Sequence, residues 1–150
     1  MYTALVGKPY EISFQYAEMM ANKVARSKGQ SKIERMYFVG YVFLRFFIQF
    51  FTFSLFFFRD NPEVDIVGAN VYNAFLQKAA SSNESLTACG LLSHPRLLSA
   101  KICESILVCT GVYDPEVHEL NPKQPWGMPT TIQFDALKAV EYVLKKENIV

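Results

Sequence analysis

The stretch that decides the fold runs from Met36 to Asn70 and has three parts. It begins with MYFVG at 36–40, continues with YVFLRFFIQFFTFSLFFFR at 41–59, and ends with DNPEVDIVGAN at 60–70. Nine of the chain's 13 Phe residues lie in the middle part, whereas the two flanks have the mixed charge of ordinary α/β sequence. Without this Phe-rich block (residues 41–59), a short apolar strand would lead directly into an acidic loop.

The junction between the strand and the acidic loop suits the binding of a cation and a phosphate group. A strand that ends at Gly40 places the next turn at the carboxyl edge of a sheet, where open α/β sheets bind ligands. Asp60 and Asp65 then offer carboxylate oxygens. Hard cations such as Mg²⁺ prefer these ligands, commonly together with phosphate. We therefore expect the two acids to lie at a magnesium site.

The joined sequence GDNPEVDIVGAN, in which Gly40 is followed by Asp60, resembles the fourth motif, GDxxxxD, of the haloacid dehalogenase (HAD)-like hydrolase superfamily. The likeness continues through Tyr72 and Asn73. It is greatest to the C2-capped subclass IIA, and within it to the HAD-like hydrolase domain-containing 5 group, also called the cat eye syndrome critical region 5 group. Two further runs resemble the same group: GKP at 7–9 is similar to its third motif, and SILVCTGVY at 105–113 to its last core strand.

The resemblance implies a fold, an activity and roles for three residues. The fold would be α/β, the C-terminal part of a HAD-type Rossmann-like parallel sheet, formed by residues 1–40 and 60–150. The activity would be Mg²⁺-dependent hydrolysis of a phosphate ester, with a small phosphorylated metabolite as substrate and the mitochondrion as location. Asp60 would be the metal ligand, Lys8 would hold the phosphate, and Asp65 would fix Lys8 and the loop.

In the superfamily that this chain resembles, the nucleophile and the acid-base aspartate lie in an N-terminal DxDG motif. The 150 residues contain no such motif. These two aspartates share the magnesium ion, which neutralises charge on the group being transferred. We therefore expect the chain to be a C-terminal portion, as in a truncated isoform, with weak or absent magnesium binding and no phosphatase activity of its own. The resemblance leaves the substrate open, because the cap that would select it has no counterpart here.

Three interpretations of the Phe-rich block remain open, and in each we expect an apolar, helical insertion. As a helix, Tyr41–Phe58 would be roughly 27 Å long, close to the thickness of a bilayer core. The chain would then be a non-enzymatic, single-pass membrane-anchored protein, although Arg45 and Gln49 would be costly inside a bilayer. The block could also be a packed native insertion.

The third interpretation is the hypothesis that the block is a retained intron. Gly40 to Val42 can be encoded as GG-GTATGT, which contains a splice donor. Phe56 to Arg59 can be encoded as TTTTTTTTCAGG, a pyrimidine tract followed by an acceptor. Removal of the sequence between these points joins Gly40 to Asp60, which restores the reading frame and the GDxxxxD motif together.

Composition excludes several other classes of protein. The net charge of +1 and the pI near 7.7 provide no basic surface for nucleic acid. The three cysteines lack the CxxC spacing of a zinc site and form no disulfide framework. The first residues resemble neither a secretory signal nor a transit peptide, so cytoplasmic or membrane locations remain alternatives to the mitochondrion.

Hydrophobic periodicity predicts the elements outside the block. We expect helices at Tyr10–Ala25, Ile66–Ala80 and Ala136–Lys146, and a buried strand at Ser105–Cys109. Asp135 is expected to cap the last helix, whose inward residues would be Leu137, Val140, Val143 and Leu144. Three prolines should keep 121–129 extended, and Trp126 within it is interpreted as a packing residue.

Overall fold

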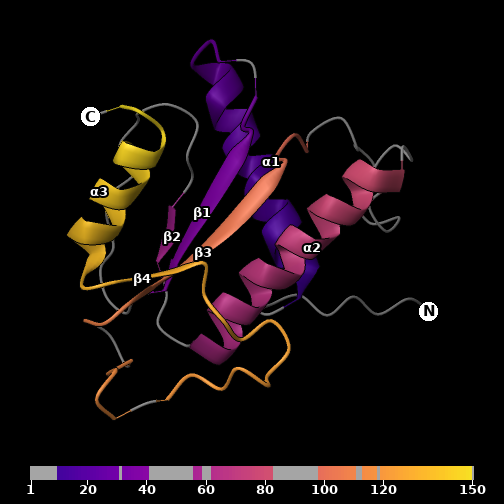
Figure 1. The fold of residues 1–150 in the computed structure, drawn as a ribbon. Coiled ribbons are helices and arrows are strands. Elements are labelled where there is room, and N and C mark those ends of the chain that lie inside the picture. Colours follow the sequence, from indigo (N-terminus) through magenta and orange to yellow (C-terminus); the bar gives the residue numbers. More distant parts are fainter. Residues whose placement is uncertain are drawn as a thin grey trace.

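The computed structural model describes residues 10–30, 32–40, 56–58, 62–82, 98–110, 113–117 and 119–149. A parallel sheet of four strands, in the order β2-β1-β3-β4, lies between two layers of helices. Helices α1 and α2 cover one face and α3 covers the other (Figure 1). This confirms the α/β class with a parallel sheet. The elements in chain order are α1 (Glu11–Ser27), β1 (Arg35–Gly40), β2 (Phe56–Phe58), a π-helical turn η1 (Pro62–Ile66), α2 (Val67–Ser82), β3 (Ile102–Val108), β4 (Thr131–Gln133) and α3 (Ala136–Lys146).

The two long strands β1 and β3 form the centre of the sheet. They pair in parallel over their full overlap, from Arg35 opposite Ile102 to Gly40 opposite Leu107. Their residues are largely apolar or aromatic, and most are buried, as expected for strands covered on both faces. The predicted strand at Ser105–Cys109 is therefore confirmed, but it begins three residues earlier, at Ile102.

Alternation along the strands divides the core into two. Side chains on one face of β1 and β3 pack with α1 and α2, where Phe14 contacts Phe38 and Tyr72 at ring-centroid distances of 4.6 and 5.8 Å. Helix α1 ends where Gly29 adopts φ of 77°, a left-handed conformation that glycine accepts without strain. Both helices lie within two residues of the bounds predicted from periodicity.

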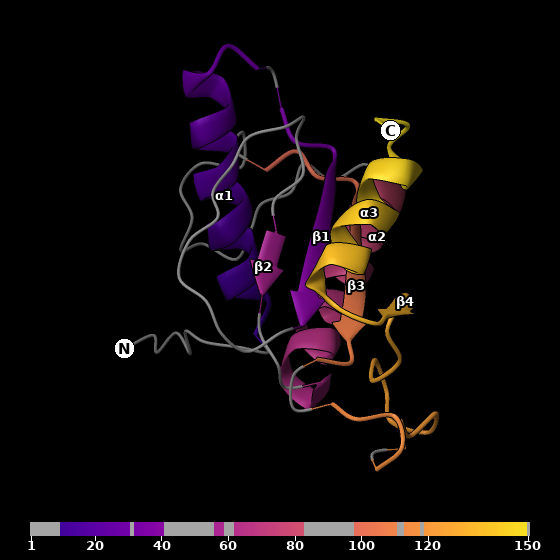
Figure 2. The ribbon, with the colours of Figure 1, turned by 90° about the vertical axis from the view of Figure 1, so that its left-hand side faces the viewer.

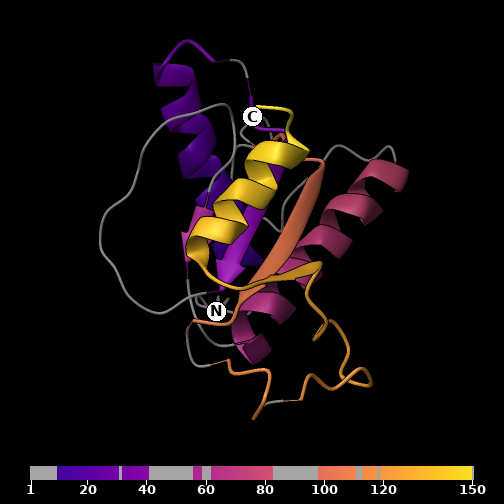
Figure 3. The same ribbon diagram turned by 60° about the vertical axis from the view of Figure 1, so that its left-hand side comes forward.

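Helix α3 covers the opposite face, onto which Figure 3 looks. It spans the predicted residues, and the carboxylate of Asp135 accepts a hydrogen bond of 2.7 Å from the backbone N–H of Lys138, as predicted. Its buried residues are Ala139 and Val143, which pack on Tyr37, Val39, Ile106 and Val108. The expectation that Leu137 faces inward is wrong, since this side chain in the first turn is 64% exposed.

The Phe-rich block contributes a strand to the sheet. Phe56–Phe58 forms β2, which pairs in parallel with Tyr37–Val39 of β1, so the helical expectation is wrong for these three residues. Residues 41–55 and 59 lie outside the described part of the chain. Among the described residues, no helix has both the length and the apolar character needed to cross a membrane.

The connection from β3 to β4 differs from the predicted extended segment. Residues 121–129 form a series of turns rather than an extended run. They lead into β4, whose three residues pair with Ile106–Val108. All the strands run parallel, and Figure 2 shows this connection beyond the carboxyl ends of β1 and β3. The connection therefore lies at the edge of the sheet where the sequence places the ligand site.

Candidate functional site

The structure describes one of the three predicted site residues. Lys8 and Asp60 lie outside the described residues, so their roles stay predictions. Asp65 lies in η1, directly before α2, and is 6% exposed. Asp65 is therefore the predicted site residue whose surroundings the structure gives.

Asp65 lies at the carboxyl edge of the sheet. The turn η1 that carries it packs against both β1 and β3. The next residue, Ile66, is buried with Leu107 near the end of β3 and with Tyr113 in the loop that follows. This apolar contact holds the turn against the sheet, so the carboxyl group is fixed where parallel α/β sheets bind ligands.

Cys109 lies at the same edge, packed against the cluster of Ile66, Leu107 and Tyr113. Burial, together with the negative charge of Asp114, raises the pKa of the Cys109 thiol above its ordinary value. A nucleophilic cysteine needs a lowered pKa, because the thiolate is the reactive form. These surroundings are those of a small apolar residue rather than of a nucleophile.

The described residues supply only part of a magnesium site. Asp65 carries hard oxygen donors of the kind that Mg²⁺ prefers, at an edge suited to a phosphate ligand. Across the described ranges, no group of three or more His, Cys, Asp or Glu residues is close enough to hold a metal ion. Asp60, the expected ligand, lies outside the described residues.

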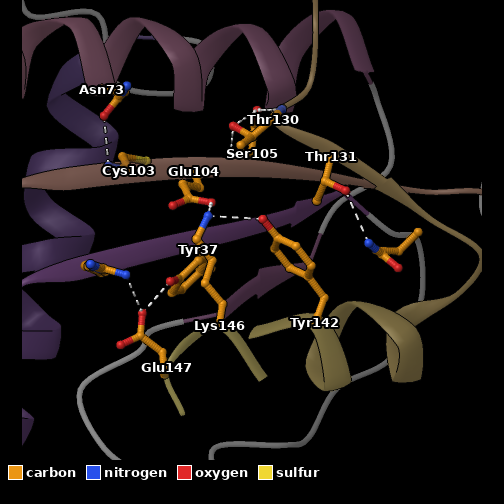
Figure 4. Close-up of polar contacts among 12 residues, drawn as sticks. Tyr37, Asn73, Cys103, Glu104, Ser105, Thr130, Thr131, Tyr142, Lys146 and Glu147 are labelled. Carbon is orange, nitrogen blue, oxygen red and sulfur yellow. Dashed lines mark hydrogen bonds and ion pairs between the residues drawn. The ribbon is translucent and has the colours of Figure 1, made fainter. Parts of the chain in front are cut away.

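A polar network joins α2 to the loop before β4. The amide Nδ2 of Asn70 donates hydrogen bonds to the backbone carbonyls of Trp126 and Met128, at 2.6 and 2.7 Å. Its Oδ1 accepts a hydrogen bond of 2.8 Å from the Ser105 hydroxyl. Thr130 completes the network, because its backbone N–H donates to the Ser105 carbonyl at 2.9 Å (Figure 4).

Sequence reasoning missed the role of this network. Asn70 and Asn73 were part of the resemblance, but no contact could be assigned to them from the sequence. In the structure Asn73 accepts a hydrogen bond of 3.0 Å from the backbone N–H of Cys103 (Figure 4). The signal was the spacing of the two amides, which places them on neighbouring positions of one helical face directed at β3.

Trp126 is not the packing residue that the sequence suggested. Its side chain is 53% exposed, and its backbone has φ of 64°. An aromatic residue rarely adopts this left-handed conformation, because the β-carbon crowds the backbone. The expectation failed because the hydrogen bonds of Asn70, rather than burial of the indole, fix this part of the chain.

A second polar cluster lies under the C-terminal end of α3, toward the amino ends of the strands (Figure 4). Lys146 donates a hydrogen bond of 2.7 Å to Glu104, and the Tyr37 hydroxyl donates one to Glu147. Burial and the hydrogen bond to Glu147 raise the pKa of Tyr37 to about 12. The ammonium of Lys146 is partly desolvated, which lowers its pKa, but its bonds to Glu104 and Tyr142 outweigh this effect and raise the pKa to about 12. The cluster attaches α3 to the sheet, at the end away from Asp65.

A third polar cluster surrounds Glu18, which is fully buried in α1. Its carboxylate accepts hydrogen bonds from the backbone N–H groups of Ser99 and Ala100, and from the Tyr72 hydroxyl. Asn22, one turn further along α1, donates to the same carboxylate at 3.3 Å. These donors come from α1, α2 and the segment before β3, so the cluster is a structural connection among three parts of the fold.

Comparison with known proteins identifies no family. No protein-family model matches the chain, and no solved structure shows a significant match to it.

Proposed function

We propose that the chain is the C-terminal part of a Mg²⁺-dependent, HAD-type phosphate-ester hydrolase. The observation that carries the proposal is the position of Asp65, which lies buried in the turn η1, between β2 and α2, at the carboxyl edge of a parallel sheet. This is the edge to which the GDxxxxD resemblance assigns the metal and the phosphate. The mitochondrial location is proposed from the same resemblance.

Each of the three residues has a proposed part in binding the substrate. Asp60 would hold the magnesium ion, which supplies neutralisation of charge on the phosphoryl oxygens. Lys8 would bind the phosphate through its ammonium group, a compact charge suited to that purpose. Asp65 would accept a hydrogen bond from Lys8 and keep the loop in place. The packing of Ile66, the last residue of η1, against Leu107 and Tyr113 supports this last role, because a positioning residue must itself be held still.

The 150 residues on their own are proposed to be inactive. They contain no DxDG motif, so the nucleophile and the acid-base group have no counterpart in this chain. The Phe-rich block also separates Gly40 from Asp60, and the loss of direct connection would disturb geometry that catalysis needs within a fraction of an ångström. We propose that the block is a retained intron, and that splicing would join these two residues.

The test begins with nucleic acid. Genomic DNA and transcripts should be sequenced across the codons of Val39 to Asn61 and upstream of Met1. We expect a splice donor and acceptor at the ends of the block, transcripts that lack it, and an in-frame DxDG motif upstream. The proposal fails if every transcript keeps the block, the genome has no splice sites there, and no upstream DxDG exists.

The second test is enzymatic and uses p-nitrophenyl phosphate with and without Mg²⁺. The purified 150-residue chain should show no Mg²⁺-dependent turnover. A spliced product with DxDG should be active, and Asp65→Asn in it should lower kcat/KM by at least about 100-fold if Asp65 positions Lys8. Asp114→Asn is the matched control, since Asp114 is an exposed acid at the same edge. Turnover by the 150-residue chain would contradict the proposed inactivity.

A further inference from the structure

The loop before β4 displays the chain's single tryptophan in an unusual way. Trp126 is 53% exposed and has a left-handed backbone conformation, with φ of 64°. That conformation costs free energy in a residue with a bulky side chain, and glycine would adopt it without this cost. An indole that is half in water recovers little of the cost through packing. Stability alone therefore does not explain a tryptophan at this position.

The backbone around Trp126 is held on both sides. Asn70 donates to the carbonyl of Trp126 at 2.6 Å and to that of Met128 at 2.7 Å, and its own oxygen is occupied by Ser105. Trp126 is also the third residue of a turn over residues 124–127, which is closed by the bond of 3.1 Å from the Gly127 N–H to the Gln124 carbonyl. The strained residue thus lies in a fixed frame, and the exposed indole is presented by a rigid support. Such strain is concentrated at binding and catalytic sites.

The hydrogen-bonded loop around Trp126 lies beside the carboxyl edge of the sheet, where the ligand is proposed to bind. Asn70 follows Asp65 by five residues along η1 and the start of α2, which corresponds to roughly 7 Å along a helix axis. Figures 1 and 2 both show the loop before β4 near the start of α2, beyond the carboxyl ends of the strands. A ligand with a phosphate group at the Asp65 edge would bring its remaining part close to this loop.

We infer that Trp126 is a specificity-determining residue whose indole stacks on a planar ring of the ligand, so that the site prefers ring-bearing phosphate monoesters over aliphatic ones. The inference rests on the proposed function, because it places the phosphate at the Asp65 edge. Stacking on a flat ring uses the face of an exposed indole, which offers a large rigid surface at little entropic cost. A preformed support for the indole raises affinity further, because no loop must be ordered on binding.

The chain's single tryptophan makes the first experiment direct. Because we expect weak or absent Mg²⁺ binding by the 150-residue chain, its indole fluorescence is followed without metal while phenyl phosphate, glycerol 3-phosphate or phenol is added. We expect saturable quenching by phenyl phosphate, at a Kd at least about tenfold lower than that of glycerol 3-phosphate or phenol. Quenching that rises linearly without saturation would overturn the inference. So would equal affinity for the two phosphate esters, or phenol binding as tightly as phenyl phosphate.

Two variants measured by titration calorimetry complete the test. Trp126→Phe keeps an aromatic face, and we expect it to retain the preference for phenyl phosphate. Trp126→Leu keeps apolar bulk without a ring and should lose that preference, with a Kd raised about tenfold. Both have a β-carbon at the same φ, so the backbone strain is matched, and circular dichroism checks their fold. Equal Kd values for the two variants would overturn the inference. The proposed function is judged separately, by the upstream DxDG and the activity of the spliced product.

Discussion

At the scale of single residues, Glu18 is a buried acid in the described part of the chain whose hydrogen bonds connect three parts of the fold. Its carboxylate lies at 0% exposure among neutral donors from three parts of the fold. Replacing Glu18 by Gln removes the negative charge to which three N–H groups donate, and it places an amide NH2 opposite the Tyr72 hydroxyl, which must then accept instead of donate. We expect Glu18→Gln to lower the free energy of unfolding by about 3 kcal/mol, measured by urea denaturation.

Two further variants separate this effect from a general loss of charge. Tyr72→Phe removes one donor to the carboxylate and should cost about 2 kcal/mol, and its effect should not add to that of Glu18→Gln because the two groups share a hydrogen bond. Glu116→Gln, at an exposed position, should change stability by less than about 0.5 kcal/mol. A Glu18→Gln chain as stable as the Glu116→Gln chain would contradict the assignment.

The raised pKa values of Tyr37 and Lys146 predict how the free energy of unfolding depends on pH. The pKa of each is raised to about 12 in the folded chain, from ordinary values of 10.0 and 10.5. The folded state therefore holds both protons more tightly than the unfolded state. The resulting stability is fully present below about pH 10 and is lost as the pH rises through about 12.

The prediction is tested with Tyr37→Phe, which cannot titrate. Between about pH 9 and about pH 11.5, its urea midpoint should fall less than that of the wild-type chain. Tyr16→Phe is the matched control, because it also removes one phenol but from a side chain that is 54% exposed. If Tyr37→Phe and the wild-type chain lost stability in parallel, the buried phenol would not be responsible.

At the scale of elements, α3 depends on a single cap. The Asp135 carboxylate accepts the Lys138 N–H, which satisfies one of the donors that a helix start leaves unpaired. We expect Asp135→Ala to destabilise the chain by about 1 kcal/mol and Asp135→Ser to cost much less, as seen in thermal unfolding followed by circular dichroism. Equal losses in the two variants would contradict this assignment, because Ser keeps a capping oxygen that Ala lacks.

The helices could be predicted from the sequence because the residues that determine a helix lie close together in the chain. The spacing of apolar residues and the Asp135 cap fixed α3, and the same spacing located α1 and α2 to within two residues. Strand β4 was missed because three residues are too short for a period of two to be recognised, and its partner Ile106 is 25 residues away. The contact of Asn70 with Trp126 spans 56 residues. Such contacts follow from the fold and not from the local pattern, so the display of Trp126 could not be predicted.

At the scale of the whole molecule, the Phe-rich block both interrupts a sequence motif and contributes a strand to the sheet. It interrupts a motif that would otherwise join Gly40 to Asp60, yet its last residues cover one side of β1 through the pairing of Phe56–Phe58 with Tyr37–Val39. In the sheet order β2-β1-β3-β4, only β2 covers this edge of β1. An uncovered strand next to apolar sequence promotes association between chains, and native proteins avoid it. Strand β2 thus has a structural use in this chain even if the block is a retained intron.

This use predicts the outcome of removing the block. Deletion of residues 41–59 from the 150-residue chain removes β2 and exposes the edge of β1, so we expect oligomers in size-exclusion chromatography with light scattering. The matched control replaces residues 41–55 by a Gly/Ser linker of equal length and keeps Phe56–Phe58. Both proteins lack residues 41–55, but only the control keeps Phe56–Phe58 to cover β1, and it should be monomeric. If the deletion were monomeric as well, β1 would need no partner strand. An oligomeric control would instead show that apolar residues before β2 protect the chain.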